Sequence, residues 1–205
     1  MTVQPGVSVG QDSDASVIER SWDEPEAFAV LFDRHADSVH RYAARRLGAE
    51  AAEDVMAETF TTAFQQRFRY RTESTDARPW LFGIATNLIG RHRRAEARRL
   101  KALSRLPSPA PGGAPGEAVA DRVAERVSAQ ALRRELAGAL ARLPARHRDV
   151  LLLVAWADLG YEEVAAALGV PVGTVRSRLH RARRKVREAL GGSDPTALRE
   201  ESDDE

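Results

Sequence analysis

The chain has 205 residues, with 31 lysines and arginines against 30 aspartates and glutamates, and its formal net charge is +1. It contains no cysteine, which excludes a disulfide scaffold, a cysteine nucleophile and a thiolate metal site. No apolar run approaches the roughly 18 residues of a membrane span, and the first residues do not resemble a secretory signal. We therefore expect a soluble cytoplasmic protein.

The small net charge conceals an uneven distribution along the chain. Residues 1–26 hold six acidic residues and one arginine, and residues 193–205 hold the same numbers. Residues 27–192 therefore carry a net charge of +11. A basic body between two acidic ends favours a polyanion as the partner, although charged ends also occur in ordinary soluble proteins.

The first domain is predicted to be helical and to span residues 27–103, after an acidic extension, residues 1–26, that we predict to be disordered. Apolar residues recur at helical spacing over residues 28–47 and again over residues 55–64. Gly48 lies between these stretches and predicts a helix end. Two consecutive helices are therefore expected.

The second half of this domain begins with residues 67–76, which are polar and rich in arginine, so that a loop is expected. Pro79 suits the first turn of a helix, and apolar residues follow it at helical spacing as far as Ile89. This helix runs into residues 91–101, which hold six basic residues and one acid. Arginines near a helix C-terminus also complement the helix dipole, which is the structural alternative to a binding role.

A linker is predicted at residues 104–118, because seven of the ten residues in 107–116 are proline or glycine. Beyond it, residues 119–191 form a second helical domain and residues 192–205 form an acidic tail. The predicted fold is all-α, with two small helical domains, each with a modest core, joined by a flexible Pro/Gly linker.

The second domain contains a helix-turn-helix pattern at residues 161–184. Gly169 permits a sharp turn, and Ala165 is small where two helices cross. Thr174 is expected to cap the second helix or to contact a phosphate.

The second helix of this motif is strongly basic. Residues 174–187 hold seven lysines and arginines and no acid. An arginine in the major groove can bond bidentately to guanine, so we predict that this helix binds duplex DNA. The stripe that would face the DNA consists of Arg176, Ser177, His180, Arg181 and Arg184. The alternative is a solvated basic helix face.

A second candidate DNA surface lies in the first domain. Trp80 and Asn87 precede the basic stretch 91–101, and Phe68 and Tyr70 lie in the preceding loop. Aromatic rings beside arginines suit an unstacked single strand, because bases stack on rings while arginines contact the backbone. The alternative is that the three rings are core residues, and the sequence leaves both interpretations open.

Five stretches of the sequence, taken in this order, resemble the extracytoplasmic-function (ECF) sigma factors of bacterial RNA polymerase. They are residues 28–35, 52–60, 77–87, 143–150 and 161–184. The resemblance implies that residues 27–103 are sigma region 2, which binds core polymerase and opens the −10 promoter element. It implies that residues 119–191 are sigma region 4, which reads the −35 element.

The resemblance also assigns roles to individual residues. Asp54 and Glu58 match the acidic pair that holds the clamp coiled coil of the largest polymerase subunit, although Ala57 replaces the usual glutamine. Without the family, an exposed acidic pair is the simpler interpretation. The residues assigned to the −10 element are Phe68, Tyr70, Trp80, Asn87, Arg91 and Arg94. The residues assigned to the −35 element are Tyr161, Pro171, Thr174, Arg176, Ser177, His180, Arg181 and Arg184.

The implied partners are core RNA polymerase and promoter DNA. Members of the family are commonly held inactive by an anti-sigma factor, and the sequence does not decide whether that applies here. A stand-alone helix-turn-helix repressor or activator is the alternative, which explains residues 145–190 but not the features of the first domain. No catalytic residue, metal or cofactor is expected, because the five histidines are scattered and no phosphate loop or nucleophile motif is present.

Overall fold

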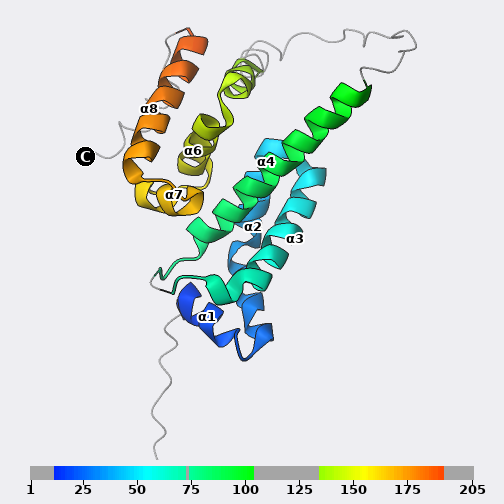
Figure 1. Cartoon of the computed structure of the whole chain (residues 1–205), viewed down its shortest axis with the longest axis vertical. Helices are drawn as coiled ribbons and strands as arrows, with labels where there is room; N and C mark the ends of the chain where they lie inside the picture. Colours follow the sequence, from blue (N-terminus) through cyan, green and yellow to red (C-terminus); the bar gives the residue numbers. More distant parts are fainter. Residues whose placement is uncertain (1–11, 73, 104–133, 192–205) are drawn as a thin grey trace, which may run out of the picture.

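The computed structural model describes residues 12–72, 74–103 and 134–191. Within these ranges every regular element is a helix, which confirms the predicted all-α fold (Figure 1). The predicted linker, residues 104–118, and the predicted acidic tail, residues 192–205, lie outside the described residues.

The first domain is built around three long helices, which are α2 (Ala29–Leu47), α3 (Ala49–Gln66) and α4 (Arg78–Leu103). Shorter helices precede or connect them, and these are α1 (Asp14–Arg20), η1 (Pro25–Phe28) and η2 (Arg67–Arg69). In the described part of the second domain, residues 134–142 are helical. They lead to α6 (Ala145–Trp156), α7 (Tyr161–Leu168) and α8 (Val172–Ala189).

Gly48 makes the turn between α2 and α3, as predicted. Its φ of 92° lies in the left-handed region that favours glycine. Its N–H closes α2 by donating to the carbonyl oxygen of Ala44 at 2.9 Å. Helix α4 then packs against both α2 and α3 (Figure 1).

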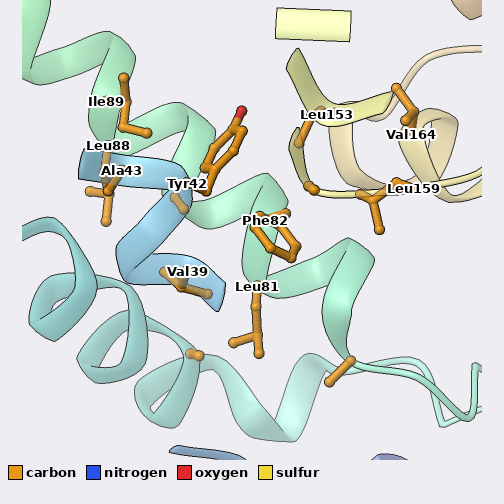
Figure 2. Close-up of a cluster of buried hydrophobic side chains, with 14 of the residues drawn as sticks. Val39, Tyr42, Ala43, Leu81, Phe82, Leu88, Ile89, Leu153, Leu159 and Val164 are labelled. Atoms are coloured by element: carbon orange, nitrogen blue, oxygen red, sulfur yellow. The ribbon is translucent and has the colours of Figure 1, made fainter. Parts of the chain in front are cut away.

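The core of the first domain forms where α2 meets α4 (Figure 2). The buried rings of Tyr42 and Phe82 meet edge to face, with their centroids 5.2 Å apart. The Tyr42 hydroxyl lies 2.9 Å from the Thr86 hydroxyl and accepts a hydrogen bond from Arg46 at 2.7 Å. The buried phenol is therefore fully partnered, which removes the cost of burying it.

The segment before α2 differs from its prediction. Disorder is expected over residues 1–26, and this expectation is wrong for residues 12–26. Helix α1 is capped by the side chain of Ser13, and its Val17 and Ile18 are fully buried in the core. Disorder was inferred from the acidic composition of this segment. Burial of these two aliphatic side chains contributes the free energy that keeps the segment folded. The first eleven residues lie outside the described part of the chain.

The helix-turn-helix pattern is present as predicted. Gly169 ends α7 in the left-handed conformation, with φ 62° and ψ 39°, and so allows the sharp turn into α8. Val164 of α7 and Val175 of α8 are fully buried, and Leu179 is 3% exposed. The apolar residues of the motif therefore form the seam that holds the two helices together.

The larger hydrophobic cluster spans both domains, although the sequence predicted a separate core for each; a smaller cluster of Leu143, Ala182 and Val186 lies within the second domain. Helix α4 packs against α7, and buried residues of α4 join Leu153, Leu159 and Val164 in one cluster (Figure 2). The approach is close at Gly83, where a Cβ atom would lie 2.4 Å from the carbonyl oxygen of Ala167. Helical periodicity within each domain does not indicate which outer faces meet.

A buried ion pair also crosses between the domains. The guanidinium of Arg46, on α2, pairs with the carboxylate of Asp149, on α6, and the Arg46 side chain is 2% exposed. Arg78, at the start of α4, donates to the carbonyl oxygen of Ala157. Removing Asp149 would leave a buried guanidinium without its counter-charge, which is costly. Polar and apolar contacts thus hold the domains in this arrangement.

Candidate nucleic-acid and polymerase interfaces

One side of α8 is buried and the other carries the stripe identified in the sequence. The buried residues are Val175, Leu179, Ala182 and Val186. All five residues of the predicted stripe, Arg176, Ser177, His180, Arg181 and Arg184, are exposed, and we call this set the α8 face. Other residues of α8, such as Arg183 and Lys185, are exposed beside it. Because its five side chains are exposed, the α8 face is free to contact a DNA duplex. Its Arg184 lies 3.6 Å from the Glu188 carboxylate, an exposed pair that offsets little of the positive charge.

The start of α8 is shaped by Pro171, which is extended, with φ −60° and ψ 146°, and exposed. Thr174 is half-buried and its side chain makes no capping hydrogen bond, so the predicted capping role is wrong. Its N–H donates instead to the carbonyl oxygen of Pro171 at 2.8 Å. A helix start without a side-chain cap favours an anion. Tyr161 is half-buried at the start of α7.

The positive charge of α8 also acts on its inner side. His147 of α6 is 5% exposed. Burial lowers the pKa of its imidazole, and the charges of Arg146, Lys185 and Arg181 lower it further. The histidine is therefore neutral at neutral pH, which avoids burying one more positive charge beneath the basic helix.

The loop before α4 and the first turn of α4 enclose a cavity of about 500 Å³, which we call the loop cavity. It is lined by Arg69, Tyr70, Arg71, Ser74, Asp76, Pro79, Trp80 and Ala166. The last of these residues belongs to α7, so the second domain forms part of the wall. A cavity of this size is within the range of small-molecule sites, and a single nucleobase fits it.

Tyr70 and Trp80 are brought together at this cavity. Their ring centroids are 4.9 Å apart, and both side chains are half-buried. The Tyr70 hydroxyl donates to the carbonyl oxygens of Ser74, at 2.8 Å, and Asp76, at 3.1 Å, which closes the loop on itself. Burial raises the pKa of this phenol, so it remains a donor at neutral pH. The two rings both support the loop and line the cavity.

Phe68 lies apart from that pair and is 59% exposed. Its ring centroid is 6.3 Å from that of Trp22, which is 40% exposed, and the Arg67 guanidinium lies 4.3 Å from the Phe68 centroid. No sequence motif marked Trp22 or Arg67 as a functional residue. No local pattern connects Trp22 with a loop more than 40 residues away, although a tryptophan in an acidic segment is an unusual residue to leave exposed.

The outer face of α4 carries the other residues assigned to single-stranded DNA. Asn87, Arg91 and Arg94 are exposed and follow one another at steps of four and three residues, so they share one side of the helix. This surface continues from the loop cavity along α4. The structure therefore joins the predicted −10 residues, except Phe68, into one path.

The predicted polymerase contacts lie close to this path. Asp54 and Glu58 are exposed on α3, and they line a groove of about 410 Å³ together with Arg91, Arg94 and other residues of α4. The Glu58 carboxylate lies 3.5 Å from the Arg91 guanidinium. Residues that the family resemblance assigns to two different partners are thus neighbours in the structure.

Among the helices of the described residues, none is long and apolar enough to cross a membrane.

Two family models match the chain. Residues 31–99 match sigma-70 region 2, and residues 133–186 match sigma-70 region 4. The first range contains the acidic pair and all residues of the loop cavity except Ala166, and the second range contains Ala166 and the α8 face. The order of the two matches is the order inferred from the sequence.

The chain is also similar to characterised proteins over most of its length. It is 36% identical over 176 residues to the ECF RNA polymerase sigma factor SigE of Mycolicibacterium smegmatis, covering 83% of this chain and 62% of that relative. It is 34% identical over 171 residues to the RNA polymerase sigma factor CarQ of Myxococcus xanthus, covering 81% and 90%. It is 36% identical over 168 residues to the ECF sigma factor SigL of Mycobacterium tuberculosis, covering 82% and 90%.

Solved structures share the fold. CnrH, solved in complex with the cytosolic domain of CnrY, matches with a TM-score of 0.60 and 24% identity, over 89% of this chain and 99% of that one. The sigma factor RpoE of Bartonella quintana, solved with the anti-sigma factor NepR, matches with a TM-score of 0.56 and 22% identity, over 80% and 96%. With both family models in order and relatives aligned over nine tenths of their length, the chain belongs to the ECF RNA polymerase sigma factors.

Proposed function

We propose that this chain directs RNA polymerase to a specific set of promoters by reading the −35 element with the α8 face and the −10 element with the loop cavity and α4. One observation carries the proposal. This chain belongs to the sigma factors, and it presents both the basic α8 face and the loop cavity, which is the size of a base, is lined by aromatic rings and continues into the basic face of α4. A stand-alone repressor or activator needs only the first of these.

Recognition of the −35 element rests on the α8 face. A helix fits the major groove, and an arginine there can bond bidentately to guanine O6 and N7. Arg176 is the candidate for such a contact because it is exposed near the start of α8. Arg181 and Arg184 suit phosphates, which position the helix without reading bases.

Opening of the −10 element rests on the loop cavity. Extruding a base from the duplex costs a few kcal/mol, and stacking on an aromatic ring returns roughly 1–3 kcal/mol per base. Tyr70 and Trp80 offer such a ring surface, and Asn87, Arg91 and Arg94 continue it toward the next nucleotides. Asp54 and Glu58 supply the polymerase contact from the adjacent helix.

Reading both elements requires the two domains to separate. The promoter positions after which the −35 and −10 elements are named differ by 25 base pairs. A duplex of that length is roughly 85 Å long, at about 3.4 Å per base pair. In this structure α4 and α7 are in direct contact, and Ala166 of α7 borders the loop cavity. We therefore take this arrangement as the closed state of the free protein.

An anti-sigma partner would stabilise that closed state. A cavity of about 360 Å³ between the domains is lined by Arg45, Arg46, Arg93 and Arg148 beside apolar residues. Burial lowers the pKa of Arg93, and the nearby charges of Arg148 and Arg46 lower it further. Asp149 pairs with Arg46, so one carboxylate faces four arginines. The remaining positive charge beside an apolar wall suits an acidic amphipathic segment. An Arg93→Glu variant is expected to escape inhibition by such a partner in a transcription assay.

The test of the proposed function is run-off transcription with the pure chain and sigma-free core polymerase on genomic fragments from the source organism. We expect discrete transcripts that disappear with Asp54→Arg and with Arg176→Glu. The matched controls are Glu53→Arg on the same helix as Asp54, and Lys185→Glu on α8 but off the α8 face. Specific binding to an operator by the chain alone, without transcripts, would favour the repressor or activator.

A further inference from the structure

A buried carboxylate in α1 holds the loop that forms the loop cavity. Asp14 is 7% exposed, although it lies in a segment with an acidic and otherwise polar start. On one side it faces α2: its Oδ1 accepts from Arg34 Nη1 at 2.9 Å, and its Oδ2 lies 2.7 Å from His35 Nε2. Arg34 and His35 thus fix the carboxylate to the long helix.

On its other side Asp14 faces the end of the loop. Its Oδ2 also accepts from the N–H of Ala77 at 3.0 Å, and its own N–H donates to the carbonyl oxygen of Thr75 at 3.1 Å. The next side chain in the loop, Asp76, accepts from the N–H of Arg78 at 2.7 Å and so starts α4. One residue therefore joins α2 to the point where the loop becomes α4.

The cluster is a hydrogen-bonded joint and not a cation site. Asp14, His35 and Asp76 lie within 4.8 Å of one another, as metal ligands do. However, the guanidinium of Arg34 and the N–H of Ala77 already occupy the two oxygens of Asp14. Burial raises the pKa of this carboxyl, but the hydrogen bonds from His35, Ala77 and Arg34 outweigh it and lower the pKa to about 2. It is ionised at every physiological pH.

We infer that Asp14 is a positioning residue for promoter opening, which sets the shape of the loop cavity and hence its selectivity for the base it receives. The loop contributes Tyr70, Arg71, Ser74 and Asp76, which are half of the residues that line the cavity. It is held from inside by the Tyr70 hydroxyl, on Ser74 and Asp76, and from outside by Asp14. A loop held at one point only would sample several shapes and select less sharply among the four bases. The inference rests on the proposed function.

The test uses holoenzyme assembled from core polymerase and the full chain, on a promoter library with a randomised −10 element. Sequencing of the transcripts gives the base preference at each position. Asp14→Asn keeps the size of the side chain but replaces one accepting oxygen with an amide NH₂ group. That group then faces hydrogen-bond donors and cannot accept from them. We expect the preference at one position to fall about tenfold, because the loop loses hydrogen bonds to a charged group. Core affinity and −35 duplex binding should be unchanged.

The matched control is Asp12→Asn, because the Asp12 carboxylate is exposed and pairs with Arg20 at 2.7 Å. The backbone carbonyl of Asp12, which accepts from Arg34 at 2.8 Å, is kept by this substitution. The control variant should keep the wild-type preference. If Asp14→Asn also reduces the affinity for core polymerase, that variant is misfolded. The base preference of His35→Phe is then measured instead, and the same loss of preference is expected. Hydrogen exchange of residues 74–77 should rise in either variant.

Different results would overturn the positioning role of Asp14 and the proposed function. If Asp14→Asn transcribes with an unchanged preference at every position, the inference is wrong and the proposed function stands. If the wild-type holoenzyme gives no promoter-dependent transcript, or shows no preference anywhere in the −10 element, the proposed function itself is wrong.

Discussion

The two predicted DNA-reading surfaces are built in different ways. The α8 face lies on one helix, and its side chains are neighbours in sequence. The surface around the loop cavity is assembled from α1, η2, the loop and α4, and even Ala166 of α7 contributes to it. A substitution on the α8 face should therefore act through its own contact, whereas one around the cavity should act through the shape of the loop.

The largest expected effect is on the α8 face. Arg176→Glu removes a candidate base contact and places a negative charge against DNA, so we expect −35 duplex affinity to fall about 100-fold, near the upper end of roughly 1–3 kcal/mol for one bidentate pair. Binding measured by fluorescence anisotropy at fixed salt checks this. Lys185→Glu, with the same change in charge, should cost much less, and equal losses would contradict a role for the face itself.

The next effect breaks the contact between the two regions. In Gly83→Ala the new Cβ would lie 2.4 Å from the backbone carbonyl oxygen of Ala167, which cannot rotate away. We expect the closed state to lose about 2.5 kcal/mol, within the typical range for overpacked sites. Small-angle scattering should report a larger radius of gyration, with both reading surfaces still intact.

Gly90→Ala is the matched control, because it lies on the same helix and its Cβ would meet only the flexible side chain of Arg94 at 3.4 Å. An alanine there should be neutral or stabilising by up to about 1 kcal/mol. Unchanged scattering from Gly83→Ala would mean that α4 and α7 are not in contact in solution.

A third effect concerns the joint at Asp14. The pKa of the Asp14 carboxyl is about 2 in the folded protein, against an ordinary value of 3.8. Because the folded pKa is lowered, the stabilisation is complete above pH 3.8 and is lost as the pH falls toward 2. It amounts to about 2 kcal/mol. Thermal unfolding of wild type and Asp14→Asn should differ most at neutral pH and converge near pH 2, and a constant difference would contradict the assignment.

The smallest effect separates ring from hydroxyl in the loop. Tyr70→Phe keeps the contact with Trp80 but removes the hydrogen bonds to Ser74 and Asp76. We expect a loss of about 1 kcal/mol, or roughly fivefold in affinity for a single-stranded −10 oligonucleotide in the holoenzyme. Trp80→Ala should lose more, since it removes a stacking surface. A larger loss in Tyr70→Phe would mean that the hydroxyl contacts DNA directly.

The elements themselves were largely predictable. Gly48 and Gly169 each mark a helix end where the observed φ is positive, and Pro79 lies in the first turn of α4, as expected. The stripe on α8 follows from three- and four-residue spacing alone. Thr174 failed as a cap because the turn after Gly169 places Pro171 at that position. A signal that depends on one backbone position is less reliable than a period repeated over a helix.

The sequence by itself determined the helices, the basic α8 face and the exposed acidic pair, because these depend on the order of residues along one element. Only the tertiary structure decided that α1 is folded, that Asp14 joins α2 to the loop, and that α4 packs on α7. Each of these involves residues brought together from distant parts of the chain, such as Asp14 with Ala77 or Gly83 with Ala167. Such contacts depend on the shape and packing of whole faces, which the local pattern does not encode.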